Sequence, residues 1–174
     1  MNRFLVVTGL PASGKSTVGK AVAEALALPF LDKDEILEAL FEALGVGDAP
    51  WRARLSRAAD QVLRRLALRS QGAVIASWWQ HPLSPVSSGT SPSWLSSLPG
   101  ELIELHCKCD PHVAVERFFA RQRHAGHLDA SKSKPEELVR FAQLASQGPL
   151  GIGRVIEINT GQELDLRALL DELV

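Results

Sequence analysis

The chemistry-bearing residues of this 174-residue chain begin with a glycine-rich stretch at positions 9–17. The stretch reads Gly9-Leu10-Pro11-Ala12-Ser13-Gly14-Lys15-Ser16-Thr17. Its two glycines let the backbone wrap closely, so that successive N–H groups point at anionic oxygens. A lysine and a hydroxyl at this spacing can reach nucleotide phosphates and a Mg²⁺ ion. The expected phosphate-binding residues are Gly9, Pro11, Ala12, Ser13, Gly14, Lys15, Ser16 and Thr17, with Ser16 also a metal ligand.

The elements on either side of this stretch favour the same interpretation. Residues Arg3–Thr8 are mostly apolar and β-branched, as in a buried parallel strand. A helix is predicted from Lys15 to about Ala27, because Val18, Val22 and Leu26 form an apolar stripe. The positive end of that helix would face the bound phosphates.

Two carboxylates follow the next short strand, Pro29–Asp32. In extended geometry, the spacing of Asp32 and Asp34 aims both side chains the same way. We expect Asp32 to assist the metal and Asp34 to accept the proton of an acceptor hydroxyl. The alternative is helix capping, with Asp32 and Glu35 forming a capping box.

Cations that could neutralise a moving phosphoryl group lie on a helix predicted over Pro111–Arg123. Arg117 and Arg121 are four residues apart and are expected to share a face and contact the nucleotide. A polar loop follows, and we expect a lid over about residues 117–134. The alternative for these arginines is a solvated helix end.

The residues that would contact the phosphate acceptor are less clearly marked in the sequence. Arg54 or Arg57, on a helix predicted over Pro50–Ser70, could reach an anionic substrate. Trp78 and Trp79 follow the third strand, and we expect one of them to be core and the other to stack on a substrate ring. The Ser- and Pro-rich segment His81–Gly100 is either a substrate-side loop or a plain connector.

Strands and helices alternate along the rest of the chain, which predicts an α/β fold with a parallel sheet covered on both faces. Ligands bind at the carboxyl ends of such strands. Ser133 and Glu136 have the spacing of a capping box. The remaining expected elements are a helix over Asp34–Leu44, strands over Ala73–Ser77, Glu101–Cys107 and Arg154–Asn159, and helices from Lys134 to Ser146 and from Glu163 to Leu173.

Composition and charge argue against several classes of protein and partner. A hydrophobic content of 45% and a charged content of 22% are ordinary for a globular protein. The net charge of −1 argues against a nucleic-acid partner and against an anionic membrane. The predicted strand at the N-terminus argues against a signal peptide, and the two cysteines, Cys107 and Cys109, favour the reducing cytoplasm. A metal site on these cysteines lacks a second ligand pair.

With these motifs, the chain resembles the small P-loop kinases, a group that includes shikimate kinase, gluconate kinase, chloramphenicol phosphotransferase and zeta-toxin-like kinases. The resemblance implies a P-loop NTPase three-layer sandwich, a five-stranded parallel sheet of order 2-3-1-4-5, and a lid after the fourth strand. It also implies that residues 159–162 lie near the base of the bound nucleotide. Ser77-Trp78-Trp79 stands where shikimate kinase has a glycine run, which argues against shikimate as the substrate.

The sequence thus predicts one domain over residues 1–174, with substrate-side regions at about 34–71 and 78–100. Its expected activity is transfer of the γ-phosphate of ATP (or GTP), with Mg²⁺, to a hydroxyl of a sugar, an antibiotic or a nucleoside. The expected state is a monomer or homodimer. Two alternatives stay open: a polynucleotide or RNA-acting 5′-hydroxyl kinase, which the arginine-rich helix favours, and a non-catalytic nucleotide-binding switch.

Overall fold

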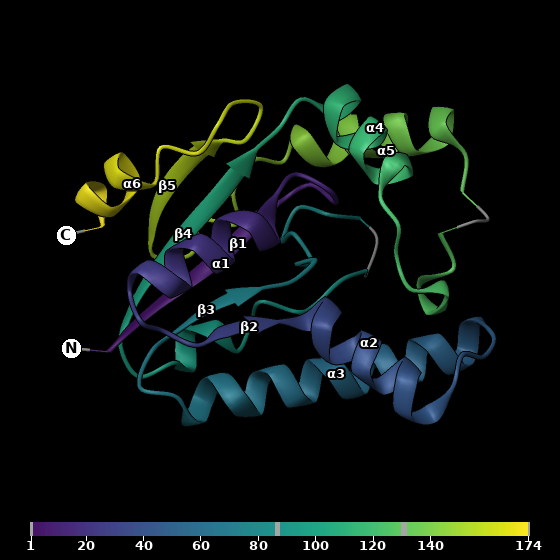
Figure 1. Cartoon of the computed structure of the whole chain (residues 1–174), viewed down its shortest axis with the longest axis horizontal. Coiled ribbons are helices and arrows are strands. Elements are labelled where there is room, and N and C mark those ends of the chain that lie inside the picture. Colours follow the sequence, from purple (N-terminus) through teal and green to yellow (C-terminus); the bar gives the residue numbers. More distant parts are fainter. Residues whose placement is uncertain (1, 86–87, 130–131, 174) are drawn as a thin grey trace.

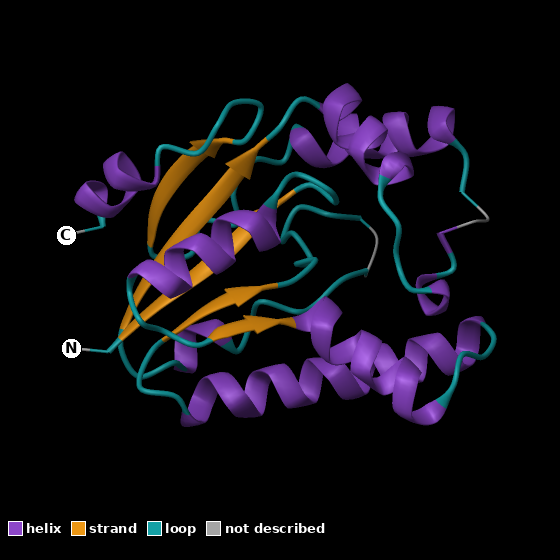
Figure 2. Ribbon diagram, viewed as in Figure 1, coloured by secondary structure: helices purple, strands orange, loops and turns teal. Residues whose placement is uncertain are grey.

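A five-stranded sheet of order β2-β3-β1-β4-β5 organises the computed structural model, which describes residues 2–85, 88–129 and 132–173. Every neighbouring pair of strands is parallel (Figures 1 and 2). The fold class and the strand order expected from the sequence are therefore confirmed. The strands are β1 (Arg3–Gly9), β2 (Phe30–Asp32), β3 (Ala73–Ala76), β4 (Glu101–Lys108) and β5 (Arg154–Asn159).

Alternation along β1 builds a core on each face of the sheet. Leu5 and Val7 pack on the face covered by helices α1 and α6, whereas Phe4 and Val6 pack under α3 and the segment Trp94–Leu98. All four β1 side chains are fully buried. The α-helices are α1 (Lys15–Ala25), α2 (Lys33–Leu44), α3 (Ala49–Arg69), α4 (Pro111–Ala120), α5 (Lys134–Ala145) and α6 (Leu166–Glu172); η1 (Leu95–Ser97) and η2 (Ala125–His127) are short 3₁₀ turns.

Two helix pairs flank the carboxyl ends of the strands. The α2–α3 pair is held together by a cluster around Leu37 and Phe41, and the α4–α5 pair by Phe118 and Phe141. Figure 1 shows the two pairs on opposite sides of the sheet, with the described part of the segment between α4 and α5 running across to α2. This arrangement leaves the phosphate-binding loop between the two pairs.

Three local expectations need correction. Helix α4 ends at Ala120, because Arg121 already has extended backbone with ψ 143°. Ser133 lies at the N-cap position of α5, as expected, but its hydroxyl makes no hydrogen bond to the helix backbone and donates instead to the Glu136 carboxylate at 2.6 Å. On α3 the buried stripe is narrower than its apolar pattern, since Val62 and Leu66 are 39% and 46% exposed.

Parts of the segment between β3 and β4 are packed into the fold. Trp94 and Leu95 are buried in the core under the sheet, and Thr90 is 1% exposed. Backbone hydrogen bonds join Thr90 to Trp78 and to Gln80. The segment is therefore more than a plain connector, although its sequence shows no periodicity. No described helix is long and apolar enough to cross a lipid bilayer.

Candidate active site

The glycine-rich stretch forms the turn between β1 and α1, and its glycines have the backbone that the turn requires. Gly9 has φ +127° and Gly14 has φ +93°, both in the region that disfavours side chains. A Cβ added at Gly9 would lie 2.5 Å from the Cys107 carbonyl oxygen of the neighbouring strand. Gly9 is therefore the residue that lets the loop turn so close to β4.

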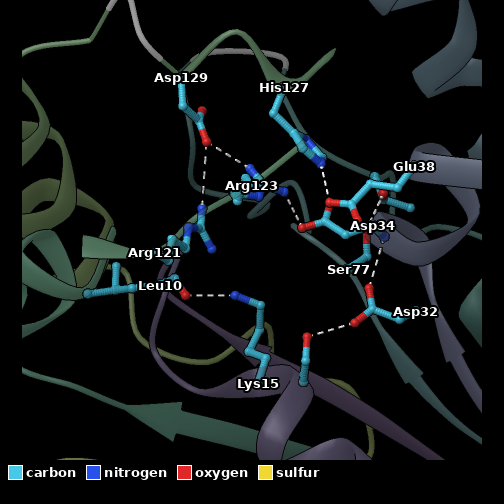
Figure 3. Close-up of polar contacts among 12 residues, drawn as sticks. Leu10, Lys15, Asp32, Asp34, Glu38, Ser77, Arg121, Arg123, His127 and Asp129 are labelled. Carbon is cyan, nitrogen blue, oxygen red and sulfur yellow. Dashed lines mark hydrogen bonds and ion pairs between the residues drawn. The ribbon is translucent and has the colours of Figure 1, made fainter. Parts of the chain in front are cut away.

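Inside the loop, two polar groups are arranged for an anion. The Lys15 ammonium folds back over the loop and donates to the carbonyls of Leu10 at 2.6 Å and Gly9 at 3.2 Å (Figure 3). Burial lowers the pKa of Lys15, while the nearby Cys107, Asp34 and Asp32 favour its charged form. The Ser13 hydroxyl is fully buried and has no hydrogen-bond partner among the described residues. A cationic cradle with an unpaired buried hydroxyl fits the phosphate oxygens of a nucleotide.

Ser16 and Asp32 meet at the edge of this cradle. The Ser16 hydroxyl donates to the Asp32 carboxylate at 2.7 Å. Burial raises the pKa of Asp32, and the hydrogen bonds from Ser16 and from the Asp34 N–H oppose that rise. A hydroxyl and a carboxylate oxygen side by side are the hard ligands that Mg²⁺ prefers, so these two residues fit the metal. The described residues contain no cluster of three His, Cys, Asp or Glu side chains that could hold a metal on their own.

Helix capping and the expected chemistry coexist at Asp32. Its carboxylate accepts the Asp34 N–H at 2.9 Å and so caps α2. Glu35 takes no part in a capping box, since it pairs with Lys20 at 2.7 Å on the exposed surface. One carboxylate oxygen of Asp32 thus accepts the capping hydrogen bond of α2, while the other accepts the Ser16 hydroxyl.

Asp34 lies on the first turn of α2 and is paired with an arginine from the segment after α4. Arg123, from the segment after α4, forms an ion pair with Asp34 and a second with Asp129 at 3.1 Å (Figure 3). One turn further along α2, Glu38 accepts a hydrogen bond from the buried His127 at 2.8 Å. The segment after α4 is thus attached to the acceptor side of the cavity by two polar contacts.

The two arginines expected on one helix face reach the cavity separately. Arg117, on the last turn of α4, donates to the Thr160 carbonyl at 3.0 Å, in the loop after β5. Arg121 lies beyond the helix end and packs over the Phe118 ring at 4.7 Å. Both line a cavity of about 850 Å³ together with Lys15, Asp32 and Asp34. Although Arg121 lies one residue past the end of α4, its N–H still donates to the Arg117 carbonyl at 3.1 Å, as in a helix, and both side chains line the same cavity.

On α3 the structure corrects the choice of arginine. Arg54 and Arg57 lie on the exposed surface and outside the cavity lining, with Arg54 over the Trp51 ring at 5.8 Å. Arg52 lines the cavity instead, and its Nε atom is buried with no hydrogen-bond partner among the described residues. The rotation of α3 about its axis determines which arginine lines the cavity. That rotation could not be predicted from arginines spread over several faces of the helix.

One tryptophan of the pair belongs to the core, as expected. Trp79 is 5% exposed, donates its indole N–H to the Val7 carbonyl at 3.0 Å and belongs to the core. It is not among the residues that line the 850 Å³ cavity, so the expected substrate contact falls to Trp78, which is half-buried and does line it. The Arg140 guanidinium lies 6.0 Å from the Trp78 ring centroid.

A buried polar cluster behind Asp34 escaped the sequence analysis. Lys33 is 7% exposed and pairs with Asp60 of α3 at 2.7 Å. The Thr90 hydroxyl donates to Asp60 at 2.7 Å and lies 2.6 Å from the Ser77 hydroxyl. These contacts join β3, α2, α3 and the segment after β3. No local pattern marks them, because each partner comes from a different part of the chain.

Comparisons with known proteins agree with this architecture. Residues 4–82, a little under half of the chain, match the family model described as an AAA domain. The crystal structure of a Chloroflexus aurantiacus protein, named as an inferred kinase, is 26% identical with a TM-score of 0.79, and the match covers 99% of this chain and 96% of that one.

More distant structures show the same fold. A shikimate kinase from Bacteroides thetaiotaomicron is 20% identical with a TM-score of 0.58, over 98% of this chain and 97% of that one. A gluconokinase from Sinorhizobium meliloti is 23% identical with a TM-score of 0.53, over 97% and 94%. A 30-residue stretch is 60% identical to the shikimate kinase of Paracidovorax citrulli, but it covers only 17% of this chain and 16% of that protein. The resemblance to P-loop kinases such as shikimate and gluconate kinase is therefore confirmed.

Proposed function

We propose that this chain is a phosphotransferase that moves the γ-phosphate of ATP or GTP, with Mg²⁺, to a hydroxyl of a small molecule. One observation carries the proposal. The Ser16–Asp32 contact at 2.7 Å lies beside Lys15, and Asp34 follows two residues later in the same cavity. A phosphate cradle, a pair of metal ligands and a carboxylate for the acceptor hydroxyl are the parts that phosphoryl transfer requires.

The roles follow from where each side chain lies. The loop from Gly9 to Thr17 would bind the phosphates through its backbone N–H groups, with Lys15 adding charge. Ser16 and Asp32 would hold Mg²⁺, which supplies charge neutralisation of the phosphates when bound. Arg117 and Arg121 would face the nucleotide from the opposite wall. We assign them to neutralisation of the charge that develops during transfer.

On the acceptor side, we assign proton transfer to Asp34. The acceptor oxygen attacks the γ-phosphorus, the bond to the β-phosphate oxygen breaks, and the hydroxyl proton passes to the Asp34 carboxylate. Arg123 orients that carboxylate through their ion pair. Trp78 offers a half-buried ring face beside it for a substrate ring.

We take residues 1–174 as one catalytic domain, with a lid at about 117–134 and substrate-side regions at about 34–71 and 78–100. The acceptor class stays broad: a sugar, an antibiotic or a nucleoside. The net charge of −1 favours a small-molecule acceptor over a polynucleotide.

The test is a screen of hydroxyl compounds for nucleotide-dependent phosphorylation by the purified protein, with ATP and with GTP and with a 5′-hydroxyl oligonucleotide in the panel. Lys15→Ala should lose both transfer and tight nucleotide binding by calorimetry. Lys20→Ala, a matched control on the exposed side of α1, should lose neither. Unchanged nucleotide affinity in Lys15→Ala would refute the phosphate-binding role, and transfer to the oligonucleotide alone would replace the small-molecule acceptor.

A further inference from the structure

A second cavity, of about 520 Å³, lies on the other side of the phosphate-binding loop. The loop itself divides the two cavities, since Gly9 and Leu10 line this one, whereas Pro11, Ala12 and residues 14–18 line the larger one. Only Trp78 and Asn159 are common to both linings among the described residues. The volume lies within the range of small-molecule pockets.

The walls of this cavity combine apolar and aromatic side chains with polar ones. They come from the loop after β1, the two tryptophans after β3, the end of α5 and the segment before β5. The apolar lining residues are Leu10, Trp78, Trp79, Leu144, Ala145 and Leu150. Aromatic faces of this kind favour a flat ring over a flexible chain.

A buried carboxylate fixes one wall in place. Glu104 of β4 is fully buried and accepts hydrogen bonds from the backbone N–H groups of Leu150, Gly151 and Ile152 at 2.8, 2.8 and 3.0 Å. It also accepts the hydroxyl proton of Thr8 at 2.7 Å. The segment before β5 is therefore held against the sheet, and the cavity keeps its shape without a ligand.

The same network determines the tautomer of His106. Because Thr8 gives its proton to Glu104, its oxygen must accept from the His106 Nδ1 atom, which lies 2.9 Å away. Burial lowers the pKa of His106, which keeps the ring neutral. Its Nε2 atom is then a lone-pair acceptor with no hydrogen-bond partner among the described residues, on a side chain that lines the cavity.

The other histidine in the lining is satisfied at both nitrogens. The Leu83 N–H donates to His81 Nδ1 at 3.1 Å, so Nε2 carries the proton and donates to the Pro149 carbonyl at 3.0 Å. His81 therefore closes the cavity wall and offers nothing to a ligand. His106 is the histidine that can recognise one.

The charges around the cavity are already engaged. Lys108 and Glu157 pair with each other at 2.9 Å on the exposed rim, and Asp110 caps α4 by accepting the His112 N–H at 2.8 Å. A charged ligand would lose hydration here without gaining a free partner of opposite sign. The lining therefore favours a neutral molecule.

From these observations we propose that the 520 Å³ cavity is a second small-molecule site, which binds a neutral aromatic or heteroaromatic compound whose N–H or O–H group donates to His106 Nε2. The site shares Trp78 and Asn159 with the nucleotide and acceptor cavity, and its other described lining residues are its own. It also adjoins that cavity through the loop backbone, since the carbonyls of Gly9 and Leu10 that bind Lys15 belong to residues of this wall.

The test uses matched probes that differ in the donor alone: indole against 1-methylindole, and phenol against anisole, with benzoate as the charged member. Binding is followed by two-dimensional NMR of the full chain saturated with a non-hydrolysable ATP analogue, which keeps the nucleotide side of the larger cavity filled. Each donor-bearing probe should shift the amide signals of Gly148 and Leu150 and bind about five-fold more tightly than its methylated partner, as one hydrogen bond would give.

Two pairs of variants locate the binding. His106→Asn keeps an amide at the Nδ1 position for Thr8 but removes the Nε2 acceptor, so it should abolish the difference between indole and 1-methylindole. His106→Gln, with a polar atom at the Nε2 position, should retain it. Ala145→Phe should fill the cavity and block both probes, whereas Ala142→Phe, on the exposed surface of the same helix and outside the lining, should not.

If substitutions at His106 disturb folding, the comparison of Ala145→Phe with Ala142→Phe still tests the proposal. Equal affinity of the donor-bearing and methylated probes in the wild-type protein would overturn the proposal. So would displacement of the probes by the nucleotide analogue, tighter binding of benzoate than of indole, or undiminished binding to Ala145→Phe.

Discussion

The two sides of the candidate active site are built differently. On the nucleotide side, the groups expected to bind phosphate lie within nine consecutive residues, Gly9–Thr17, and much of the site is backbone. On the acceptor side, Asp34, Arg52, Asp60 and Arg123 converge from α2, α3 and the segment after α4. One side is encoded locally and the other by tertiary contacts.

The two sides also differ in how their charges are satisfied. Among the described residues, Lys15 donates to neutral carbonyls and forms no ion pair, and the Ser13 hydroxyl has no partner, so an incoming phosphate would meet a cation that is not in an ion pair. Asp34 is already paired with Arg123, and Lys33 with Asp60. The nucleotide side is therefore prepared for its ligand, whereas an acceptor must share or displace an existing ion pair.

The sharpest way to break this comparison is to remove the carboxylate of Asp34. Asp34→Asn should lower kcat and kcat/KM together by roughly 10²-fold or more, the usual scale of general base catalysis. Nucleotide affinity should change little, because the phosphate cradle is a separate set of groups. Steady-state kinetics and calorimetry would measure both, with Glu35→Gln as an exposed neighbour that should leave both unchanged.

Near wild-type turnover of Asp34→Ala on an acceptor found in the screen would remove Asp34 from the mechanism. Its carboxylate would then be a structural partner of Arg123, and an acceptor-side base would have to be sought around Ser77 and Trp78.

A second test addresses the metal position. Asp32→Asn should raise the Mg²⁺ concentration needed for nucleotide binding by about 10- to 100-fold, the scale found for altered metal-site partners. Burial raises the pKa of Asp32, so protons compete with the metal at higher pH than at an ordinary carboxyl. In the wild-type protein the Mg²⁺ requirement should therefore rise as the pH falls toward that pKa.

The asparagine variant cannot ionise, so its Mg²⁺ requirement should not vary with pH over the same range. Calorimetric Mg²⁺ titrations at several pH values would measure this, with Asp171→Asn, an exposed residue of α6, as the control. An identical pH dependence in Asp32→Asn and the wild type would move the metal role to another residue.

The same contrast explains what could be predicted from the sequence. The element types and the loop at Gly9 follow from apolar periodicity and from one contiguous motif, whereas the strand order is what the resemblance to the small P-loop kinases implies. The end of α4 at Ala120 could not be predicted, since residues 121–124 contain no glycine or proline to stop a helix. Contacts of the following segment with α2, such as Arg123 with Asp34, are tertiary and leave no local signal.

Arg52 illustrates the remaining limit. A helix with arginines at 52, 54 and 57 presents charge on several faces, and only the packing of Leu55 and Ala59 fixes which arginine faces inward. If the acceptor carries an anionic or hydrogen-bonding group, Arg52→Gln should raise its KM by about ten-fold, on the scale of one hydrogen bond to a charged group. Arg54→Gln should change KM less than two-fold, since its side chain lies outside the cavity. The reverse order of effects would show that the arginine facing inward in this structure is not the one that meets the substrate.

The smallest effect concerns the segment between α4 and α5, which joins the two sides. His124 stacks on the Phe41 ring at 5.3 Å, and the buried His127 bonds to Glu38, so α2 holds this segment beside the acceptor position. Arg121 has a buried Nε atom with no hydrogen-bond partner among the described residues, which a nucleotide phosphate would supply. A non-hydrolysable nucleotide should therefore slow amide exchange about five-fold over the expected lid, residues 117–134.

Glu38→Ala leaves the His127 ring nitrogen buried without its partner, and should speed exchange of residues 123–129 by a similar factor in the free protein. Glu42→Ala, one turn further along α2 and exposed, should not. Hydrogen exchange followed by mass spectrometry measures the effect of nucleotide on the wild type and the effects of the two substitutions. If nucleotide leaves exchange of residues 117–134 unchanged, the segment is a fixed wall of the cavity. The acceptor side would then close on its substrate without the help of the nucleotide side, and the two would be independent in binding as well as in construction.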